Sequence, residues 1–132
     1  MITRITIKSE SGYSPADSAY KDRITITRSS IRYETTNPAF DDPPIRWTIT
    51  NHSAVFEKMF RNLCEEVEEI IALPEAPLSR DLGTTTFEIM DEDGSKRVKT
   101  LDEPDERYTI CFTIIDQMVK SVVPVKRDGR CI

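Results

Sequence analysis

The sequence predicts an α+β fold with a single antiparallel sheet of about six strands and two helices packed on one face, in the order ββββ-α-ββ-α. Six segments alternate between apolar and polar residues, as strands with one buried face do, and two longer segments repeat apolar residues at helical spacing. Strands and helices do not alternate along the chain, which argues against a parallel sheet. With 132 residues and no internal repeat, the chain is expected to form one domain over residues 1–132.

Four strands are expected before the first helix. Residues 2–8, 23–27 and 45–50 each alternate between apolar and polar side chains. The alternation changes parity at Ser29–Ser30, which predicts a tight hairpin, or a bulge, before the third strand. The side chains of these strands that are expected to face the core are Ile5, Ile7, Ile24, Ile26, Ile31, Tyr33, Ile45, Trp47 and Ile49.

The first helix is expected to begin at Ser53 and to end by Pro74. Serine is a good N-cap, and proline cannot continue a helix. Glu57 and Arg61 lie four residues apart on the outer side, where they can pair. The apolar side chains at helical spacing are Val55, Phe56, Met59, Phe60, Leu63, Val67, Ile70 and Ile71.

The second half of the chain repeats these patterns. Residues 84–90 and 96–101 alternate, and the Asp93–Gly94 step between them is a strong hairpin signal. A second helix follows, with Pro104 suited to its first turn, and the chain from about residue 125 is expected to be a flexible tail. The strand residues expected to face the core are Phe87, Ile89 and Val98. The apolar stripe of the helix is Tyr108, Cys111, Phe112, Ile115, Met118, Val119 and Val122.

Composition limits the environment of the protein. No apolar run approaches the ~20 residues that a membrane span requires, and the N-terminus lacks the apolar core of a signal peptide, so a cytoplasmic protein without membrane contact is expected. Cytoplasmic thiols stay reduced, so Cys64, Cys111 and Cys131 are expected to form no disulfide. The net charge is −5, and residues 65–106 hold 4 basic and 14 acidic side chains. This acidity argues against general binding to duplex nucleic acid.

Residues with catalytic or metal-binding chemistry are scattered. His52 is the only histidine, and Cys64 lies twelve positions further along the predicted helix. That separation is about 18 Å by the helical rise, so the two side chains cannot form a catalytic pair. The segment "DEDGS" at 91–95 resembles the start of a calcium loop, but the glycine and glutamate that such a loop needs further on are missing, and a hairpin turn explains it. We therefore expect no catalytic residue, no metal site and no cofactor.

One ridge of the second helix is apolar outside the main stripe. Ile110, Ile114 and Met118 are spaced four residues apart, so they line up along the helix. We expect the ridge to pack against the first helix. The alternative is that the ridge forms a homodimer interface or a surface for another partner.

The outward face of the sheet is predicted to be basic. With the inward residues named above, its basic side chains are Arg4, Lys8, Arg23, Arg32, Arg46, Arg97 and Lys99. Glu34 and Glu88 are the acidic side chains expected there, so the face would have a net charge of +5 in a chain of −5. Threonines fill the remaining positions, a composition that is also common on ordinary solvated strands.

These observations favour a small binding or regulatory protein that acts through protein–protein contacts. An inhibitor, an immunity or anti-defence factor, or an accessory subunit would have this size, acidity and lack of motifs. The first alternative is a protein that binds single-stranded nucleic acid or another anion on the basic sheet face, which the lack of outward aromatic residues weakens. The second is an enzyme with a site built from loops, which has no support from motif spacing. Its loops would be 9–22, 37–44 and 74–83, with Tyr13, Tyr20, Phe40 and His52 near one mouth.

Overall fold

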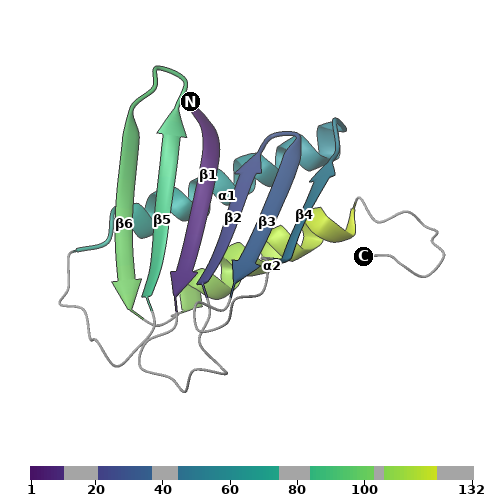
Figure 1. Cartoon of the computed structure of the whole chain (residues 1–132). Coiled ribbons are helices and arrows are strands. Elements are labelled where there is room, and N and C mark those ends of the chain that lie inside the picture. Colours follow the sequence, from purple (N-terminus) through teal and green to yellow (C-terminus); the bar gives the residue numbers. More distant parts are fainter. Residues whose placement is uncertain (11–20, 37–44, 75–83, 103–105, 122–132) are drawn as a thin grey trace.

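The computed structural model consists of one open antiparallel six-stranded sheet and two helices, and the predicted fold and element order are confirmed (Figure 1). The structure describes residues 1–10, 21–36, 45–74, 84–102 and 106–121, with the side chains of 102 and 106–108 left aside. The elements are β1 (Ile2–Glu10), β2 (Lys21–Thr27), β3 (Ser30–Thr36), β4 (Ile45–Thr50), α1 (Ala54–Ile71), β5 (Thr84–Asp91), β6 (Lys96–Asp102) and α2 (Glu106–Lys120).

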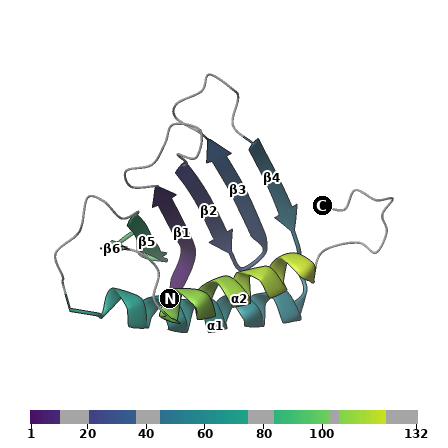
Figure 2. The same ribbon diagram turned by 90° about the horizontal axis from the view of Figure 1, so that it is seen from below.

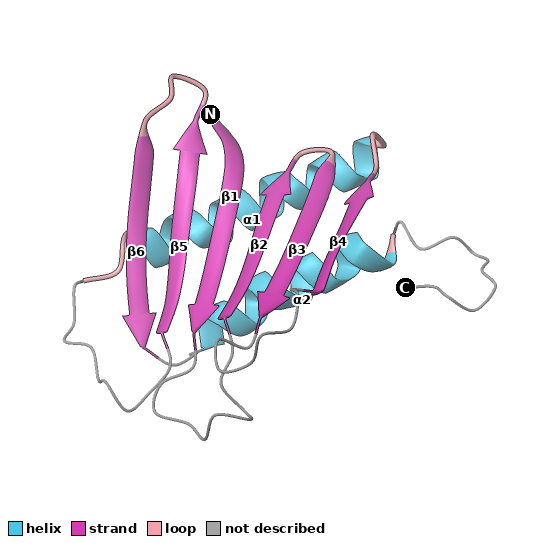
Figure 3. Cartoon of the chain, viewed as in Figure 1, coloured by secondary structure: helices cyan, strands magenta, loops and turns pink. Residues whose placement is uncertain are grey.

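The N-terminal strand lies inside the sheet. The strand order is β4-β3-β2-β1-β5-β6, so β1 pairs with both β2 and β5, while β4 and β6 form the two edges. Figure 3 shows the strands as one layer, and Figure 2 shows both helices on the same face of it. We call this face the inner face and the opposite one the outer face. No helix within the described ranges is long and apolar enough to cross a membrane.

Two tight hairpins form at the positions that the sequence predicts. Thr27 pairs with Ser30 across a two-residue turn, which explains the change of parity between β2 and β3. Between β5 and β6, Gly94 has a φ of +89°, a conformation that glycine adopts without steric cost. The Asp93 carboxylate accepts hydrogen bonds from the backbone N–H of Ser95 at 2.9 Å and from its hydroxyl at 2.7 Å. These bonds close the "DEDGS" segment into a turn, and they also lower the pKa of Asp93.

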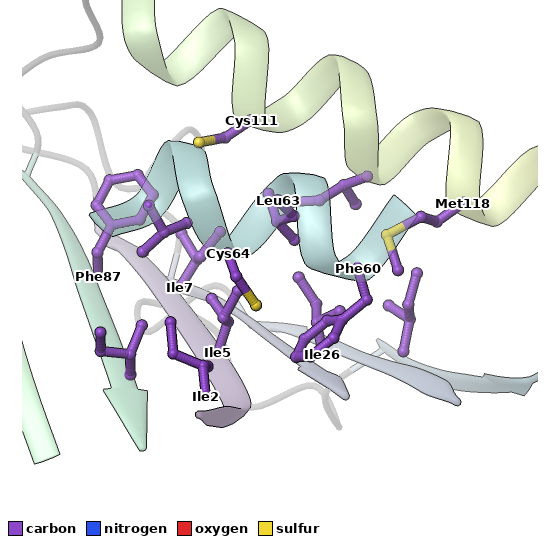
Figure 4. Packing of buried hydrophobic residues seen from close by; sticks show 14 of the residues in the cluster. Ile2, Ile5, Ile7, Ile26, Phe60, Leu63, Cys64, Phe87, Cys111 and Met118 are labelled. Atoms are coloured by element: carbon purple, nitrogen blue, oxygen red, sulfur yellow. The ribbon is translucent and has the colours of Figure 1, made fainter. Parts of the chain in front are cut away.

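The core lies between the inner face and α1, and α2 packs mainly against α1 (Figure 4). In the sheet, Ile5, Ile26, Phe87 and Ile89 are fully buried, as their alternation predicted. The helices contribute Phe56, Phe60, Leu63, Val67, Ile70, Cys111, Ile115 and Met118 to the same cluster. Burial of this apolar surface is the main favourable contribution to folding.

Helix α1 begins where the sequence predicts. The Ser53 hydroxyl accepts a hydrogen bond from the backbone N–H of Phe56 at 3.1 Å, as an N-cap does. Glu57 and Arg61 form the expected ion pair at 3.8 Å, and Arg61 also donates to the carbonyl of Ile2 at 3.0 Å. Val55 differs from the prediction: it is exposed, because it lies in the first turn beyond the cover of the sheet.

The predicted burial of Trp47 and Phe112 is wrong. Trp47 lies on the inner face and stacks on Tyr33 with ring centroids 5.2 Å apart, yet it is 38% exposed, and Phe112 is 37% exposed. Along β4, exposure increases from the partly buried Ile49 through Trp47 to Ile45 at 66%. Figure 2 shows the reason: the strands diverge from the helices toward this end, so the inner face is not fully covered there.

The apolar ridge of α2 packs as expected along most of its length. Met118 is fully buried, and Ile114 packs against the core from a partly buried position. Ile110 remains 46% exposed. Because Met118 points into the core (Figure 4), the three residues do not form one exposed surface.

The predicted orientation of β6 is wrong. Arg97 and Lys99 pair with Ile89 and Phe87 of β5, which places both on the inner face, whereas Val98 lies on the outer face and is 54% exposed. Val98 and Leu101 have opposite parity, so they cannot both point inward, and in the structure it is Leu101 that packs against the core, from a partly buried position. Arg97 and Lys99 therefore do not belong to the outer basic face.

Candidate functional site

The outer face of the sheet is the best candidate for a functional site. Cross-strand partners in an antiparallel sheet point to the same side, so the five strand registers determine its members. Its basic side chains are Arg4, Lys8, Lys21, Arg23, Arg32, Arg46 and Lys96. Glu10, Glu34 and Glu88 are acidic side chains on this face, and Asp102, which pairs with Thr84 at the end of β6, belongs to it by register, so the strand residues of this face have a net charge of +3.

Five of the seven predicted basic residues lie on this face, namely Arg4, Lys8, Arg23, Arg32 and Arg46. The prediction missed Lys21 and Lys96. Lys21 shares the parity of Arg23, but β2 begins two residues earlier than the segment 23–27 assigned from its alternation. Lys96 was missed because β6 was assigned the opposite orientation. The face therefore stays basic although two of its predicted members are replaced.

Four of the seven basic side chains have an acidic neighbour, and two of these four share one carboxylate. Lys8 and Lys96 lie 3.9 Å and 3.7 Å from the carboxylate of Glu88. Lys21 lies 3.9 Å from Glu10, and the Nε of Arg46 donates to Glu34 at 3.0 Å. In the part of the chain that the structure describes, Arg4, Arg23 and Arg32 form no ion pair; the guanidinium of Arg4 instead lies 3.5 Å from the sulfur of Met90.

These three arginines line one hollow. The hollow has a volume of about 280 Å³, and we call it the arginine hollow. It is lined by Arg4, Thr6, Arg23, Thr25, Arg32 and Glu34. Thr6 and Thr25 are direct cross-strand partners, and Arg32 lies beside Thr25 on the next strand. The hollow thus joins β1, β2 and β3 in the middle of the sheet.

A buried hydroxyl lies at the centre of the arginine hollow. Thr6 is only 3% exposed although it belongs to the outer face, because the long side chains around it cover it. Within the described ranges, the Thr6 hydroxyl makes no hydrogen bond. A buried hydroxyl without a partner is uncommon, because its desolvation is not compensated.

A register irregularity in β1 lies next to Arg4 and changes the side to which Ile2 points. The register of β1 against β5 shifts between Ile2 and Arg4, so that an extra β1 residue lies between them. Ile2 consequently turns into the core, where it is 5% exposed, while Arg4 points outward. The strand pattern in the sequence gives no signal for this bulge.

A second hollow of about 350 Å³ lies on the inner face, in the gap between the diverging strands and α2. It is lined by Ile7, Ser9, Asp22, Ile24, Tyr33, Thr35 and Phe112. Its polar groups bind one another, because the Thr35 hydroxyl donates a hydrogen bond to the Asp22 carboxylate. This hollow lies beside strand ends whose connecting segments are outside the described residues.

The remaining candidate residues do not form a catalytic group. His52 is exposed next to the Ser53 cap, whereas Cys64 and Cys111 are free thiols in the core. Burial raises the pKa of Cys64 to about 11, although Arg61 opposes the shift, and it raises the pKa of Cys111 to about 12. Both thiols are therefore protonated and weakly nucleophilic at neutral pH. Cys131, Tyr13, Tyr20, Phe40, Pro104 and the predicted tail lie outside the described residues.

The fold and the outer face together define an α+β protein whose open sheet presents a basic surface. Within the described ranges, no three His, Cys, Asp or Glu side chains gather closely enough to hold a metal ion. No protein-family model matches this chain, and no curated protein is significantly similar to it.

Proposed function

We propose that this chain is a small cytoplasmic binding protein that docks an acidic protein partner on the outer face of its sheet. The main support is the distribution of charge: this face has a net charge of +3, while the whole chain has −5. Helix α1, on the opposite side of the sheet, has five acidic and two basic side chains, a net charge of −3. Such polarity orients an acidic partner during encounter and repels it from the helix side.

The shape of the outer face also suits a protein partner. In the described part of the chain both helices cover the inner face, so the outer face is an open platform of six strands (Figure 1). Threonine and arginine side chains provide hydrogen-bond donors over this platform, and arginine is enriched at protein interfaces. A regulatory role as an inhibitor or accessory subunit would follow from such docking.

The test is a charge reversal on each side of the molecule. Arg32→Glu together with Arg46→Glu reverses charge on the outer face, and Lys58→Glu together with Lys120→Glu makes the same change on the exposed sides of α1 and α2. The partner is first isolated with the tagged wild-type protein, and its affinity for each variant is then measured by calorimetry at low and at physiological ionic strength.

We expect the outer-face variant to weaken the association by about tenfold or more and to flatten its dependence on salt, because close charge pairs across the interface are lost. The helix-side variant should stay within about twofold of the wild-type affinity. Both variants should unfold at nearly the wild-type denaturant concentration, because exposed charges contribute little to stability. An association that ignores both ionic strength and the outer-face reversal would contradict the proposal.

The second candidate function is binding of single-stranded nucleic acid, and the unpaired Arg4, Arg23 and Arg32 are the observation that favours it. Proteins of this kind usually stack bases on aromatic side chains. Among the described residues, the outer face has no aromatic side chain, since Tyr33, Trp47 and Phe87 all lie on the inner face. Saturable binding of a labelled oligonucleotide that the Arg32→Glu/Arg46→Glu variant abolishes would favour this candidate over the first.

A further inference from the structure

We infer that the arginine hollow is an oxyanion site that takes a phosphate monoester presented by the protein partner. This inference rests on the proposed docking of a protein on the outer face. It adds a specific ligand class and a specific position: a phosphorylated side chain bound by Arg4, Arg23, Arg32 and Thr6.

The position of the unbalanced charge is the first support. Four of the seven basic side chains on the face have an acidic neighbour within 4 Å, and the three that have none within the described ranges all line this one hollow. The three arginines without an acidic neighbour are thus gathered in the middle of the sheet, whereas Lys8 and Lys96 share the single carboxylate of Glu88. A concentrated positive site attracts a compact anion more strongly than a diffuse basic surface does.

The geometry suits one tetrahedral oxyanion. The three arginines project from the adjacent strands β1, β2 and β3, and neighbouring strands lie about 4.8 Å apart, so their side chains can converge from roughly 10 Å of sheet. Guanidinium groups donate pairs of parallel hydrogen bonds that match phosphate oxygens. A hollow of about 280 Å³ has room for a phosphate group and the side chain that carries it.

The Thr6 hydroxyl is the second, independent support. It is 3% exposed and lines the hollow, and it makes no hydrogen bond within the described ranges. An oxyanion in the hollow would accept a hydrogen bond from this hydroxyl. The ligand would therefore compensate the desolvation of a buried donor that the protein alone leaves without an acceptor.

Glu34 also lines the hollow, and its charge opposes an anion. Its carboxylate accepts the hydrogen bond from Arg46 at 3.0 Å, which balances its charge and holds it toward β4. With Glu34 balanced in this way, three arginines remain to face the ligand. Three positive charges favour the phosphate dianion over the single charge of an aspartate or glutamate side chain, so docking would depend on phosphorylation of the partner.

The same charges disfavour a nucleic acid strand. A chain of phosphates that continued beyond the hollow would meet Glu88 on one side, and basic residues that are already paired on the other. Sequence-independent binding of single strands also relies on aromatic stacking, which the described outer face does not offer. An isolated phosphate on a protein segment fits this pattern better than a polyanion does.

The experiment is an NMR titration of the ¹⁵N-labelled full-length chain. The probes are inorganic phosphate, N-acetyl-O-phosphoserine amide, its unphosphorylated form, and a single-stranded oligothymidylate. Sodium chloride at matched ionic strength is the salt control. We expect both phosphate compounds to cause saturable shifts of the Thr6, Arg23, Thr25 and Arg32 amides, and the unphosphorylated amide and chloride to cause none.

Variants test the contribution of each group. Arg23→Gln together with Arg32→Gln should raise the Kd for phosphoserine amide about tenfold or more, because two charge-assisted contacts are lost. The matched control, Lys21→Gln together with Lys96→Gln, removes the same charge from the same face outside the hollow and should stay within about twofold. Thr6→Val, which keeps the shape and removes the hydroxyl, should raise the Kd about fivefold.

Three results would overturn the inference: shifts that chloride reproduces, an equal loss of affinity in the control variant, or tighter binding of oligothymidylate with increasing length. The first would mean that the hollow binds anions without selectivity, and the last would identify a nucleic acid site. If the protein partner responds to the Arg32→Glu/Arg46→Glu reversal but no phosphate compound binds, the inference fails and the proposed docking stands. Saturable phosphate binding with a partner that ignores charge reversal would show an oxyanion site in the hollow, but it would refute both the docking and the presentation of the phosphate by that partner.

Discussion

The two faces of the sheet treat basic side chains differently. On the outer face, Arg23 and Arg32 line an open hollow and form no ion pair within the described ranges. On the inner face, Arg97 donates to Glu68 of α1 at 3.0 Å, and the ammonium of Lys99 donates to the backbone carbonyl of Leu73. All four residues occupy alternating strand positions, so the alternation alone does not reveal which of them will find a partner.

The difference arises at the C-terminal end of α1. The last four carbonyls of a helix receive no hydrogen bond from an N–H group within the helix. They also form the negative end of the helix dipole. The last turn of α1 has no basic side chain of its own. Lys99, from the edge strand β6, donates to the carbonyl of Leu73, two residues beyond the last residue of α1, and is 4% exposed. A lysine on a strand therefore performs the stabilising role that a residue in the last turn of a helix usually has.

The largest expected effect is on the free energy of unfolding, and it differs between a basic residue on the inner face and one on the outer face. Lys99→Glu would place a carboxylate against the Leu73 carbonyl in a buried position, so we expect a loss of about 3 kcal/mol or more in the free energy of unfolding. Arg32→Glu on the outer face should change it by no more than about 0.5 kcal/mol. Chemical denaturation followed by circular dichroism measures both. A Lys99→Glu variant as stable as Arg32→Glu would mean that Lys99 points outward, as its sequence pattern suggested.

A smaller effect is expected from two ion pairs of equal length on opposite faces. Arg97–Glu68 on the inner side and Arg46–Glu34 on the outer face are both 3.0 Å long and partly exposed. Double-mutant cycles with glutamine should give a coupling energy of about 0.5 kcal/mol for each, decreasing with added salt. Similar values would show that burial, rather than the face, makes Lys99 important. A coupling above about 2 kcal/mol at Arg97 alone would indicate that this pair is shielded from solvent.

The smallest effect is expected at Val98. It is 54% exposed on the outer face, so Val98→Thr should change the free energy of unfolding by less than about 0.5 kcal/mol. Leu101→Thr, on the inner face of the same strand and packed against the core, should cost more, about 1 to 2 kcal/mol. The reverse order in thermal melts would show that β6 pairs in the register expected from its sequence.

For β1 and β5, which lie inside the sheet, the side chains that face the core were predictable from local patterns. Ile5 and Ile7 in β1, and Phe87 and Ile89 in β5, face the core because alternation with period two can bury one side only. The pattern fails in β6, an edge strand whose two apolar residues have opposite parity. In that strand the packing of Leu101 and the bond of Lys99 to α1 select the register, and both involve residues far away in the sequence.

The positive charge of the outer face was predictable from the sequence, but the grouping of its arginines was not. Alternation placed Arg4, Arg23 and Arg32 outward, because an unpaired charge is costly inside a core. Their convergence around Thr6 depends on the order β3-β2-β1, which sets residues far apart in sequence side by side. The same limit explains Trp47: its strand parity was right, but its exposure depends on the divergence of the sheet from the helices.

The sequence by itself determined the order of the elements, the two hairpins and the start of α1 at Ser53, because turn residues, caps and apolar periodicity act over a few neighbouring positions. Only the tertiary structure decided which side of β6 faces the helices, how far β4 is covered, and which basic residues remain without an acidic neighbour. These properties depend on strand order and on the distance between layers. Both are set by contacts between distant segments, whose stability comes from shared burial.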